Sequence, residues 1–209
     1  IIGVIEMLTI AIVSQKGGAG KSTLSVHLTA YAASNGVKCA LIDLDPQASV
    51  SAWHGLREAD DIELIPSHPP LVAKQVDQLA KAGFELCVID TPPHNSTAAA
   101  NAINAATLTV VPVRPSAFDL AGAQATFDLI KQNKAKGGAV LMAVPSGSSV
   151  EQAATEFITG SGLKVIGRTG QRIAFQHAIT AGKGVTEFSR SSVAAKEIIE
   201  LWESIRGMA

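Results

Sequence analysis

Residues 11–23 read Ala11-Ile-Val-Ser-Gln-Lys-Gly-Gly-Ala-Gly-Lys-Ser-Thr23, and this stretch decides the fold. An aliphatic run, 8–13, precedes it, and a segment with helical spacing, 22–33, follows. A glycine-rich turn between a buried strand and a helix lets backbone N–H groups close around phosphate oxygens. Lys21 can then reach the β and γ phosphates, and Ser22 can hold Mg²⁺. The stretch therefore predicts a nucleotide phosphate site.

The loop departs from the common phosphate-loop pattern at its first position. That pattern, GxxxxGK[ST], requires glycine where this chain has Gln15, although its second half, Gly20-Lys-Ser22, is intact. The loop instead carries a second lysine, Lys16, at its beginning. Two lysines flanking three glycines would repel each other without an anion between them, so we interpret the loop as a phosphate site rather than a structural turn.

The rest of the chain alternates short apolar runs with segments of helical spacing. The runs predict buried strands at 8–13, 39–44, 62–65, 86–89, 107–113 and 140–144, with another near Val165. Helices are predicted over 22–33, 71–82, 98–106, 120–134, 150–158, 173–181 and 193–205. This alternation is typical of an α/β fold, a mostly parallel twisted sheet with helices on both faces.

No linker divides the pattern, so residues 1–209 are expected to form a single domain. Met7 is a candidate natural start, with residues 1–6 as upstream sequence or an artificial extension. Cys39 and Cys87 fall inside apolar runs and belong to no CxxC motif, which indicates reduced core thiols and a reducing cytoplasm.

Composition restricts the kind of function. The chain has 17 basic and 18 acidic residues, a formal charge of -1, which excludes a uniformly basic DNA-coating protein. Hydrophobic residues make up 47% and aromatic residues only 4%, so the core must be aliphatic, as in sheets covered by helices. Any site for a polyanion must therefore be local.

Carboxylates follow two further predicted strands. Asp43-Leu-Asp45-Pro-Gln47 closes the second strand, and Asp90-Thr-Pro-Pro93 follows the fourth. Because the carboxyl ends of parallel strands open onto one crevice, these side chains are expected to face the phosphate loop. An isolated aspartate at such a position is often only a helix cap, but three beside a phosphate loop favour a functional role.

At these three motifs the chain resembles the deviant Walker A P-loop NTPases, and within them the ParA-type partition ATPases. Its length and the segment Pro112-Val-Arg-Pro-Ser116 make it most similar to the small ParF-like branch. The resemblance implies hydrolysis of ATP to ADP and phosphate, with ATP and Mg²⁺ as cofactors.

The resemblance also implies roles for individual residues. Lys16 would cross a dimer interface to the partner's nucleotide, Lys21 would bind phosphate, and Asp45 would position the attacking water. Mg²⁺ would be held by Ser22, supported by Asp43, with Asp90 acting through water. The implied nucleotide-binding residues are Gly17, Gly18, Ala19, Gly20, Lys21, Ser22 and Thr23 in the loop, with Pro112, Arg114 and Pro115 from the segment that would wall the adenine.

Basic residues are concentrated late in the chain. Residues 1–163 hold 10 basic and 14 acidic side chains, net -4, whereas residues 164–196 hold six basic side chains against Glu187, net +5. Doubled in a dimer, this region predicts non-specific, salt-sensitive DNA binding. The predicted DNA-binding residues are Arg168, Arg172, Lys183, Arg190 and Lys196.

The resemblance further implies an ATP-bound homodimer, association with the nucleoid in that state, and a ParB-like or other adaptor that stimulates hydrolysis. The cargo stays open: a plasmid, a chromosome region, a protein compartment or a receptor cluster.

Two alternatives remain from the same superfamily. A MinD-like ATPase would bind membrane through a basic C-terminal helix, but 196–206 contains three glutamates that anionic lipid would repel. We therefore expect no membrane partner, and expect Ile198, Leu201, Trp202 and Ile205 to pack on the protein. A metabolic P-loop ligase is not excluded by the sequence.

Overall fold

The computed structural model describes residues 7–146 and 149–208, so residues 1–6, with the prediction made for them, lie outside the described residues. All strand pairs of its seven-stranded sheet are parallel, in the order β3-β2-β4-β1-β5-β6-β7. The predicted fold class is confirmed. The strands are β1 (Leu8–Ile12), β2 (Cys39–Asp43), β3 (Ile62–Pro66), β4 (Leu86–Asp90), β5 (Leu108–Val113), β6 (Gly137–Val144) and β7 (Lys164–Gly170).

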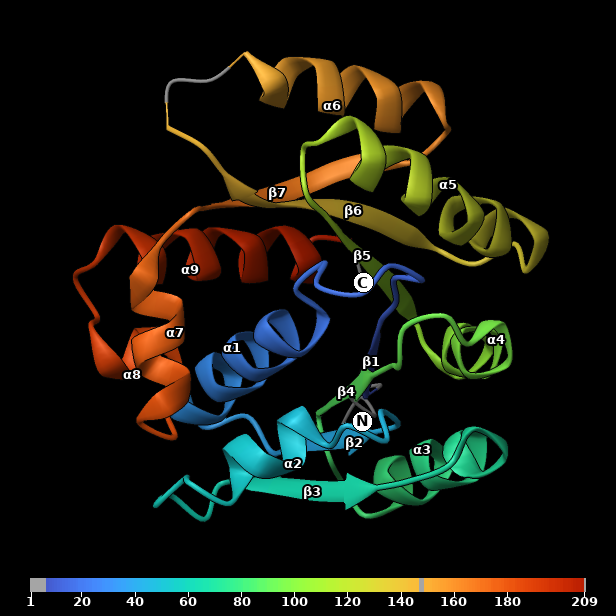
Figure 1. The fold of residues 1–209 in the computed structure, drawn as a ribbon. Helices are drawn as coiled ribbons and strands as arrows, with labels where there is room; N and C mark the ends of the chain where they lie inside the picture. Colours follow the sequence, from blue (N-terminus) through green and yellow to red (C-terminus); the bar gives the residue numbers. More distant parts are fainter. Residues whose placement is uncertain (1–6, 147–148, 209) are drawn as a thin grey trace.

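Helices cover both faces of the sheet (Figure 1). Two separate clusters of buried side chains define the layers. One cluster joins the sheet to α1 (Lys21–Ser34), α2 (Ser49–His54), α7 (Ile173–Thr180), α8 (Val185–Phe188) and α9 (Val193–Arg206). The other joins it to α3 (Val72–Lys81), preceded by a 3₁₀ turn at Pro69–Leu71, and to α4 (Ser96–Ala105), α5 (Ala117–Gln132) and α6 (Val150–Gly160).

The two cysteines illustrate how the sheet separates these layers. Cys39 on β2 belongs to the first cluster and Cys87 on the neighbouring β4 to the second. Both are buried, as predicted, and burial raises the pKa of each thiol to about 12. The thiolate, which is the reactive form, is therefore suppressed in both.

Two helices escaped the sequence prediction, and α5 begins earlier than predicted. The short helices α2 and α8 have six and four residues, too few for a helical hydrophobic period to show. Helix α5 begins at Ala117 rather than at 120, because the Ser116 hydroxyl accepts a hydrogen bond from the Asp119 N–H at 3.2 Å and caps the helix.

The packing predicted for the last helix is confirmed. Ile198, Leu201, Trp202 and Ile205 of α9 are all buried in the first cluster. Among the helices of the described residues, none is both long enough and apolar enough to cross a membrane.

A buried histidine ties α1 to the C-terminal helices. His27 is fully buried, and its Nδ1 accepts a hydrogen bond from the Val185 N–H at 3.1 Å. Its ring also lies 5.1 Å from that of Phe175 on α7. Burial lowers the pKa of His27 to about 3, so the ring is neutral in the folded protein at physiological pH.

Because His27 is buried in its neutral form, the free energy of unfolding should decrease as the pH falls. The unfolded chain binds a proton at His27 near its ordinary pKa of 6.5, whereas the folded protein does not until about pH 3. We therefore expect His27 to lower the free energy of unfolding by about 2 kcal/mol between pH 7 and pH 5. The His27→Asn variant keeps an acceptor for Val185 but cannot titrate. In urea unfolding it should lose less stability than wild type over this range, and equal losses would contradict the prediction.

Candidate nucleotide site

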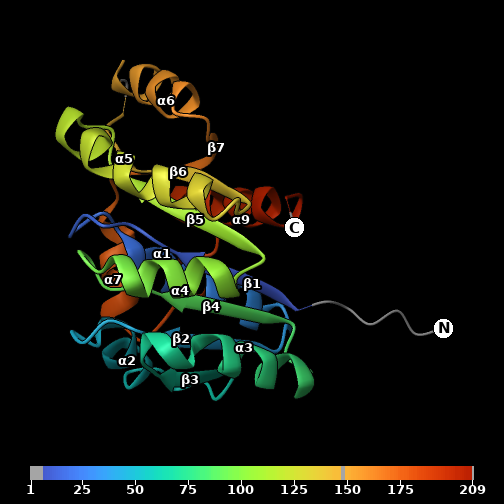
Figure 2. The same ribbon diagram turned by 90° about the vertical axis from the view of Figure 1, so that its right-hand side faces the viewer.

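The carboxyl ends of the parallel strands meet at one edge of the sheet. The loops that follow β1, β2 and β4 lie together there, on the left-hand side of Figure 2. Asp90 pairs in register with Ile12 on one side and with Asp43 on the other. The three predicted motifs are therefore brought together at this edge.

The glycine-rich loop forms an open cradle beside a buried lysine. Gly18 and Gly20 have φ angles of 73° and 100°, a backbone conformation that side chains disfavour. Gly17 and Gly18 are exposed, whereas Lys21 is buried with its Nζ 3.5 Å from the Lys16 carbonyl oxygen. Burial lowers the pKa of Lys21, although Asp90 and Asp45 oppose the shift. A desolvated ammonium beside exposed N–H groups suits a phosphate.

Asp90 joins the end of β4 to the start of α1. Its carboxylate is fully buried and accepts hydrogen bonds from the hydroxyls of Ser22 at 2.7 Å and Ser25 at 2.9 Å. Burial raises the pKa of Asp90 to about 7, against the effect of both hydroxyls. In the part of the chain that the structure describes, no three His, Cys, Asp or Glu side chains cluster as metal ligands. Ser22 with Asp90 behind it fits Mg²⁺, which takes few protein ligands and completes its shell with phosphate and water.

Asp43 organises the turn that leads into α2. One of its oxygens accepts from the Asp45 N–H at 3.1 Å, and the other from the Ser51 N–H at 3.1 Å and the Ser51 hydroxyl at 2.6 Å. Asp45 is half-buried, and its carboxylate accepts from the Gln47 N–H at 2.9 Å. The oxygens of Asp43 are thus engaged within the turn, and the sequence had not pointed to Ser51 as their partner.

A cavity of about 290 Å³ adjoins the loop. Four of the ten predicted nucleotide-binding residues line it: Ala19, Gly20, Thr23 and Arg114. The other six do not: Gly17, Gly18, Lys21, Ser22, Pro112 and Pro115. Pro112 is instead buried within β5. The remaining lining residues were not predicted for this site: Met142, Ala143, Thr169, Gly170, Gln171, Arg172, Phe175 and Gln176. They lie near the ends of β6 and β7 and on α7, at the edge where ligands bind in such sheets.

Left-handed backbone recurs around the site at non-glycine residues. Ala48, His94 and Ala143 each have a φ of 53°. The Ala48 N–H donates to the Asp45 carbonyl at 2.8 Å, and the His94 N–H to the Gln15 carbonyl at 3.0 Å. Such residues cost on the order of 1 kcal/mol each and persist where surrounding contacts fix them, commonly at functional loops.

The side chain of Lys16 leaves the loop and lies against α5. Its Nζ is 2.8 Å from a carboxylate oxygen of Asp119 on α5, and its side chain is 35% exposed. A Cβ added at Gly122 would come within 3.3 Å of the Lys16 Cδ, so this glycine leaves room for the lysine stem. Burial alone would raise the pKa of Asp119, but hydrogen bonds with Lys16 and Ser116 outweigh it, and the pKa is lowered.

Comparison with known proteins identifies the family of this chain. The family described as the CobQ/CobB/MinD/ParA nucleotide binding domain matches residues 10–207. The chain belongs to this family. It is a nucleotide-binding ATPase that uses ATP.

Individual relatives agree with this assignment. The chain is 32% identical to the chromosome-partitioning ATPase Soj of Thermus thermophilus over 142 residues, which cover 54% of this chain and 57% of Soj. It is 28% identical to the maintenance of carboxysome distribution protein A of Halothiobacillus neapolitanus, over 96% of this chain and 97% of that protein. The structure of the septum site-determining protein MinD of Pyrococcus horikoshii with Mg-ADP superposes with a TM-score of 0.80 at 17% identity, covering 95% of this chain and 96% of MinD.

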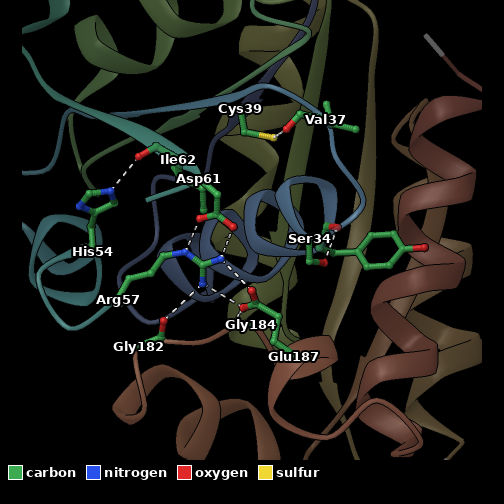
Figure 3. Close-up of polar contacts among 11 residues, drawn as sticks. Ser34, Val37, Cys39, His54, Arg57, Asp61, Ile62, Gly182, Gly184 and Glu187 are labelled. Carbon is green, nitrogen blue, oxygen red and sulfur yellow. Dashed lines mark hydrogen bonds and ion pairs between the residues drawn. The ribbon is translucent and has the colours of Figure 1, made fainter. Parts of the chain in front are cut away.

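In this ParA/MinD-family ATPase, a buried arginine fastens α2 to the C-terminal third of the chain (Figure 3). The side chain of Arg57 is only 2% exposed and lies between two carboxylates. It makes two hydrogen bonds to Asp61, both at 2.7 Å, and two to Glu187, at 2.7 and 2.9 Å. Nearby, a Cβ on Gly182 would come within 2.2 Å of the Leu56 carbonyl oxygen, so only glycine permits this approach. We call Arg57, Asp61 and Glu187 the arginine clasp.

The residues predicted to bind DNA come from several elements of the C-terminal third of the chain. Arg168, Arg172 and Lys196 line a groove between β7 and α9, together with Glu197 and Glu200. Arg172 also lines the cavity beside the loop. The remaining two lie elsewhere: Lys183 follows α7, and Arg190 follows α8 and lines a separate hollow beside Tyr31.

Two of the five are neutralised by ion pairs. Arg168 lies 3.0 Å from Glu151, and Arg172 lies 2.8 Å from Glu197. Across residues 7–146 and 149–208, no ion pair involves Lys183, Arg190 or Lys196.

Removing the arginine of the clasp should destabilise the fold. Arg57→Ala leaves Asp61 and Glu187 facing each other without their shared cation, so we expect a loss of about 3–5 kcal/mol in the free energy of unfolding. Arg57→Lys should restore only part of it, because an ammonium cannot bind two carboxylates bidentately. Urea unfolding measures the free energy of unfolding of both variants, with a substitution at an exposed position, Arg206→Ala, as the control. A loss for Arg57→Ala no larger than the control's would contradict the assignment.

Proposed function

We propose that this chain is a ParA-type positioning ATPase of the ParF-like kind. It forms a homodimer on binding ATP, binds DNA non-specifically in that state, associates with the nucleoid, and leaves the DNA when an adaptor protein stimulates hydrolysis. The observation that carries the proposal is the placement of the two loop lysines. Lys21 is buried behind the cradle, whereas the side chain of Lys16 is partly exposed and paired with Asp119 of α5, where a second copy can meet it.

The residues divide the work of phosphoryl transfer as follows. Lys21 and the loop N–H groups neutralise and orient the phosphates, while Ser22, with Asp90 behind it, would hold Mg²⁺, whose charge would offset that of the phosphate oxygens. Asp45, set by the turn that Asp43 organises, positions the attacking water. Lys16 of the second copy supplies the last positive charge, so the complete site requires the dimer.

A mixing experiment tests whether Lys16 acts across the dimer. Lys16→Ala and Asp45→Ala should each lower ATP turnover by roughly 10²-fold or more, because each removes one part of the same site. In a mixed dimer, the site that retains Asp45 receives Lys16 from the other copy. Random pairing should then restore about a quarter of wild-type turnover, from one working site in half of the dimers.

If Lys16 acts within its own chain, the mixture will show only the mean of the two inactive variants. Phosphate release at matched total protein concentration gives the readout. Analytical ultracentrifugation of the mixture with an ATP analogue confirms that mixed dimers form.

The DNA surface is proposed to use the cations that the structure leaves unpaired. Lys183, Arg190 and Lys196 are exposed, whereas Arg168 and Arg172 would have to exchange a carboxylate for a DNA phosphate. Such contacts carry no base readout, so binding is expected to be insensitive to sequence and sensitive to salt.

Reversing two of these charges should weaken DNA binding. Lys183→Glu with Arg190→Glu is expected to reduce the affinity of the ATP-bound protein for a random duplex at least about tenfold. It should lower the salt slope by about two for each subunit that contacts the DNA, about four for the dimer. Fluorescence anisotropy with ATP, ADP or no nucleotide measures this at two salt concentrations. Lys74→Glu with Lys134→Glu, on α3 and after α5, makes the matched control.

An undiminished affinity would contradict this surface. If the wild-type protein binds no DNA in any nucleotide state, the evidence would instead favour the ligase or membrane alternative. The cargo is left open, because the relatives are named for different ones: chromosomes for Soj and carboxysomes for the distribution protein.

A further inference from the structure

Arg172 lies between the end of β7 and the start of α7 and lines two hollows at once. One is the cavity beside the phosphate loop, and the other is the groove between β7 and α9. The guanidinium can therefore meet either a nucleotide in the cavity or a ligand in the groove. Its contacts within the protein decide between the two.

Glu197 of α9 binds Arg172 from the groove. One carboxylate oxygen accepts hydrogen bonds from Nε and Nη2 of Arg172, at 3.1 and 2.8 Å, and the other accepts from the Gly170 N–H at 3.0 Å. Glu197 lines the groove but not the cavity, and its side chain is only 12% exposed. The edge of the guanidinium that faces Glu197 is therefore already neutralised.

Gly170 fixes the plane of the guanidinium. A Cβ at Gly170 would lie 2.9 Å from Cζ and Nη2 of Arg172 and 3.0 Å from Nε. These nearly equal distances place one face of the guanidinium against the Gly170 backbone. Among residues 7–146 and 149–208, no hydrogen bond is made by Nη1. Nη1 and the second face are thus left for a ligand.

The cavity is where such a ligand can lie. Its wall on the loop side is made by Ala19, Gly20 and Thr23, so the part of a nucleotide beyond its phosphates has room there. A guanidinium with a free face and a free N–H group can stack on a purine ring or donate a hydrogen bond to the base or the sugar. Lys21, by contrast, is placed for the phosphates.

We propose that Glu197 is a positioning residue for ATP: from α9 it holds Arg172 so that the free part of the guanidinium meets the nucleoside. Arg172 then belongs to the nucleotide site and not to the DNA surface. Neither dimerisation nor DNA binding is needed for this role. Because Glu197 also holds the Gly170 N–H, the position of α9 is tied to the wall of the cavity.

Two ligands separate this role from a general structural one, because inorganic triphosphate can occupy the phosphate loop but has no sugar or base. Arg172→Ala should raise the dissociation constant for a non-hydrolysable ATP analogue at least about tenfold, and Glu197→Gln about fivefold, since each removes or misplaces a charged donor. Both variants should bind inorganic triphosphate within about twofold of wild type. Displacement of a fluorescent nucleotide measures both dissociation constants.

Glu200→Gln is the matched control. It removes the other carboxylate that lines the groove, one turn further along α9, and should leave the binding of both ligands unchanged. Equal losses of ATP analogue and inorganic triphosphate in Arg172→Ala and Glu197→Gln would mean that the variants disturb the loop itself, and would overturn the proposal.

The double variant, measured with the ATP analogue alone, tests whether Glu197 acts through Arg172. If it does, Glu197→Gln should weaken binding no further once Arg172 is replaced by alanine. Additive losses would contradict the positioning role. A single Glu197→Gln variant that binds the ATP analogue like wild type would contradict it as well.

Discussion

A carboxylate with no exposed surface lies at the end of β4, and the nucleotide site depends on how Asp90 is stabilised. Burying a charged group without partners costs several kcal/mol, so the two serine hydroxyls of α1 that reach it are a structural requirement. They fix the first turns of α1 against β4, and with them Lys21. The adjacent Thr91 hydroxyl donates to the Ile12 carbonyl at 2.8 Å, which holds β4 to β1 where the loop begins. The cradle is therefore set by the sheet and needs no ligand to define it.

Polar contacts also fix the C-terminal helices to α1 and to the segment after α2. His27, two residues beyond Ser25 on α1, accepts a hydrogen bond from the start of α8, and the arginine clasp joins the end of α2 to Glu187 on that helix. Phe175 on α7, which contacts His27, also lines the cavity beside the loop. The C-terminal helices beside the cavity are thus anchored both to α1, through His27, and to the segment after α2, through Arg57.

These contacts between residues far apart in the chain could not be predicted from the sequence. The strands and the three motifs were predictable because apolar runs and loop chemistry are local signals. Arg57 and Glu187 are 130 positions apart and look like ordinary surface charges, so only the fold reveals their burial. The late run of basic residues predicted one patch, but Glu151 and Glu197, which neutralise two of them, lie outside that run. The cavity wall was missed because it is assembled from the ends of strands β6 and β7 and from α7, without a motif.

The two loop lysines show how burial separates residues of identical chemistry. Lys21 is buried at the closed end of the loop, where the carboxylates of Asp90 and Asp45 act on its ammonium. Moving Lys21 would therefore disturb the buried polar groups around Asp90. Lys16 and Asp119 are both partly exposed, and ion pairs of this kind contribute only about 0–1 kcal/mol. A triphosphate carries several negative charges and can compete for Lys16 with little loss to the fold. The proposed dependence of hydrolysis on a second copy then follows from this difference: one lysine is a fixed part of the site, and the other is exchangeable.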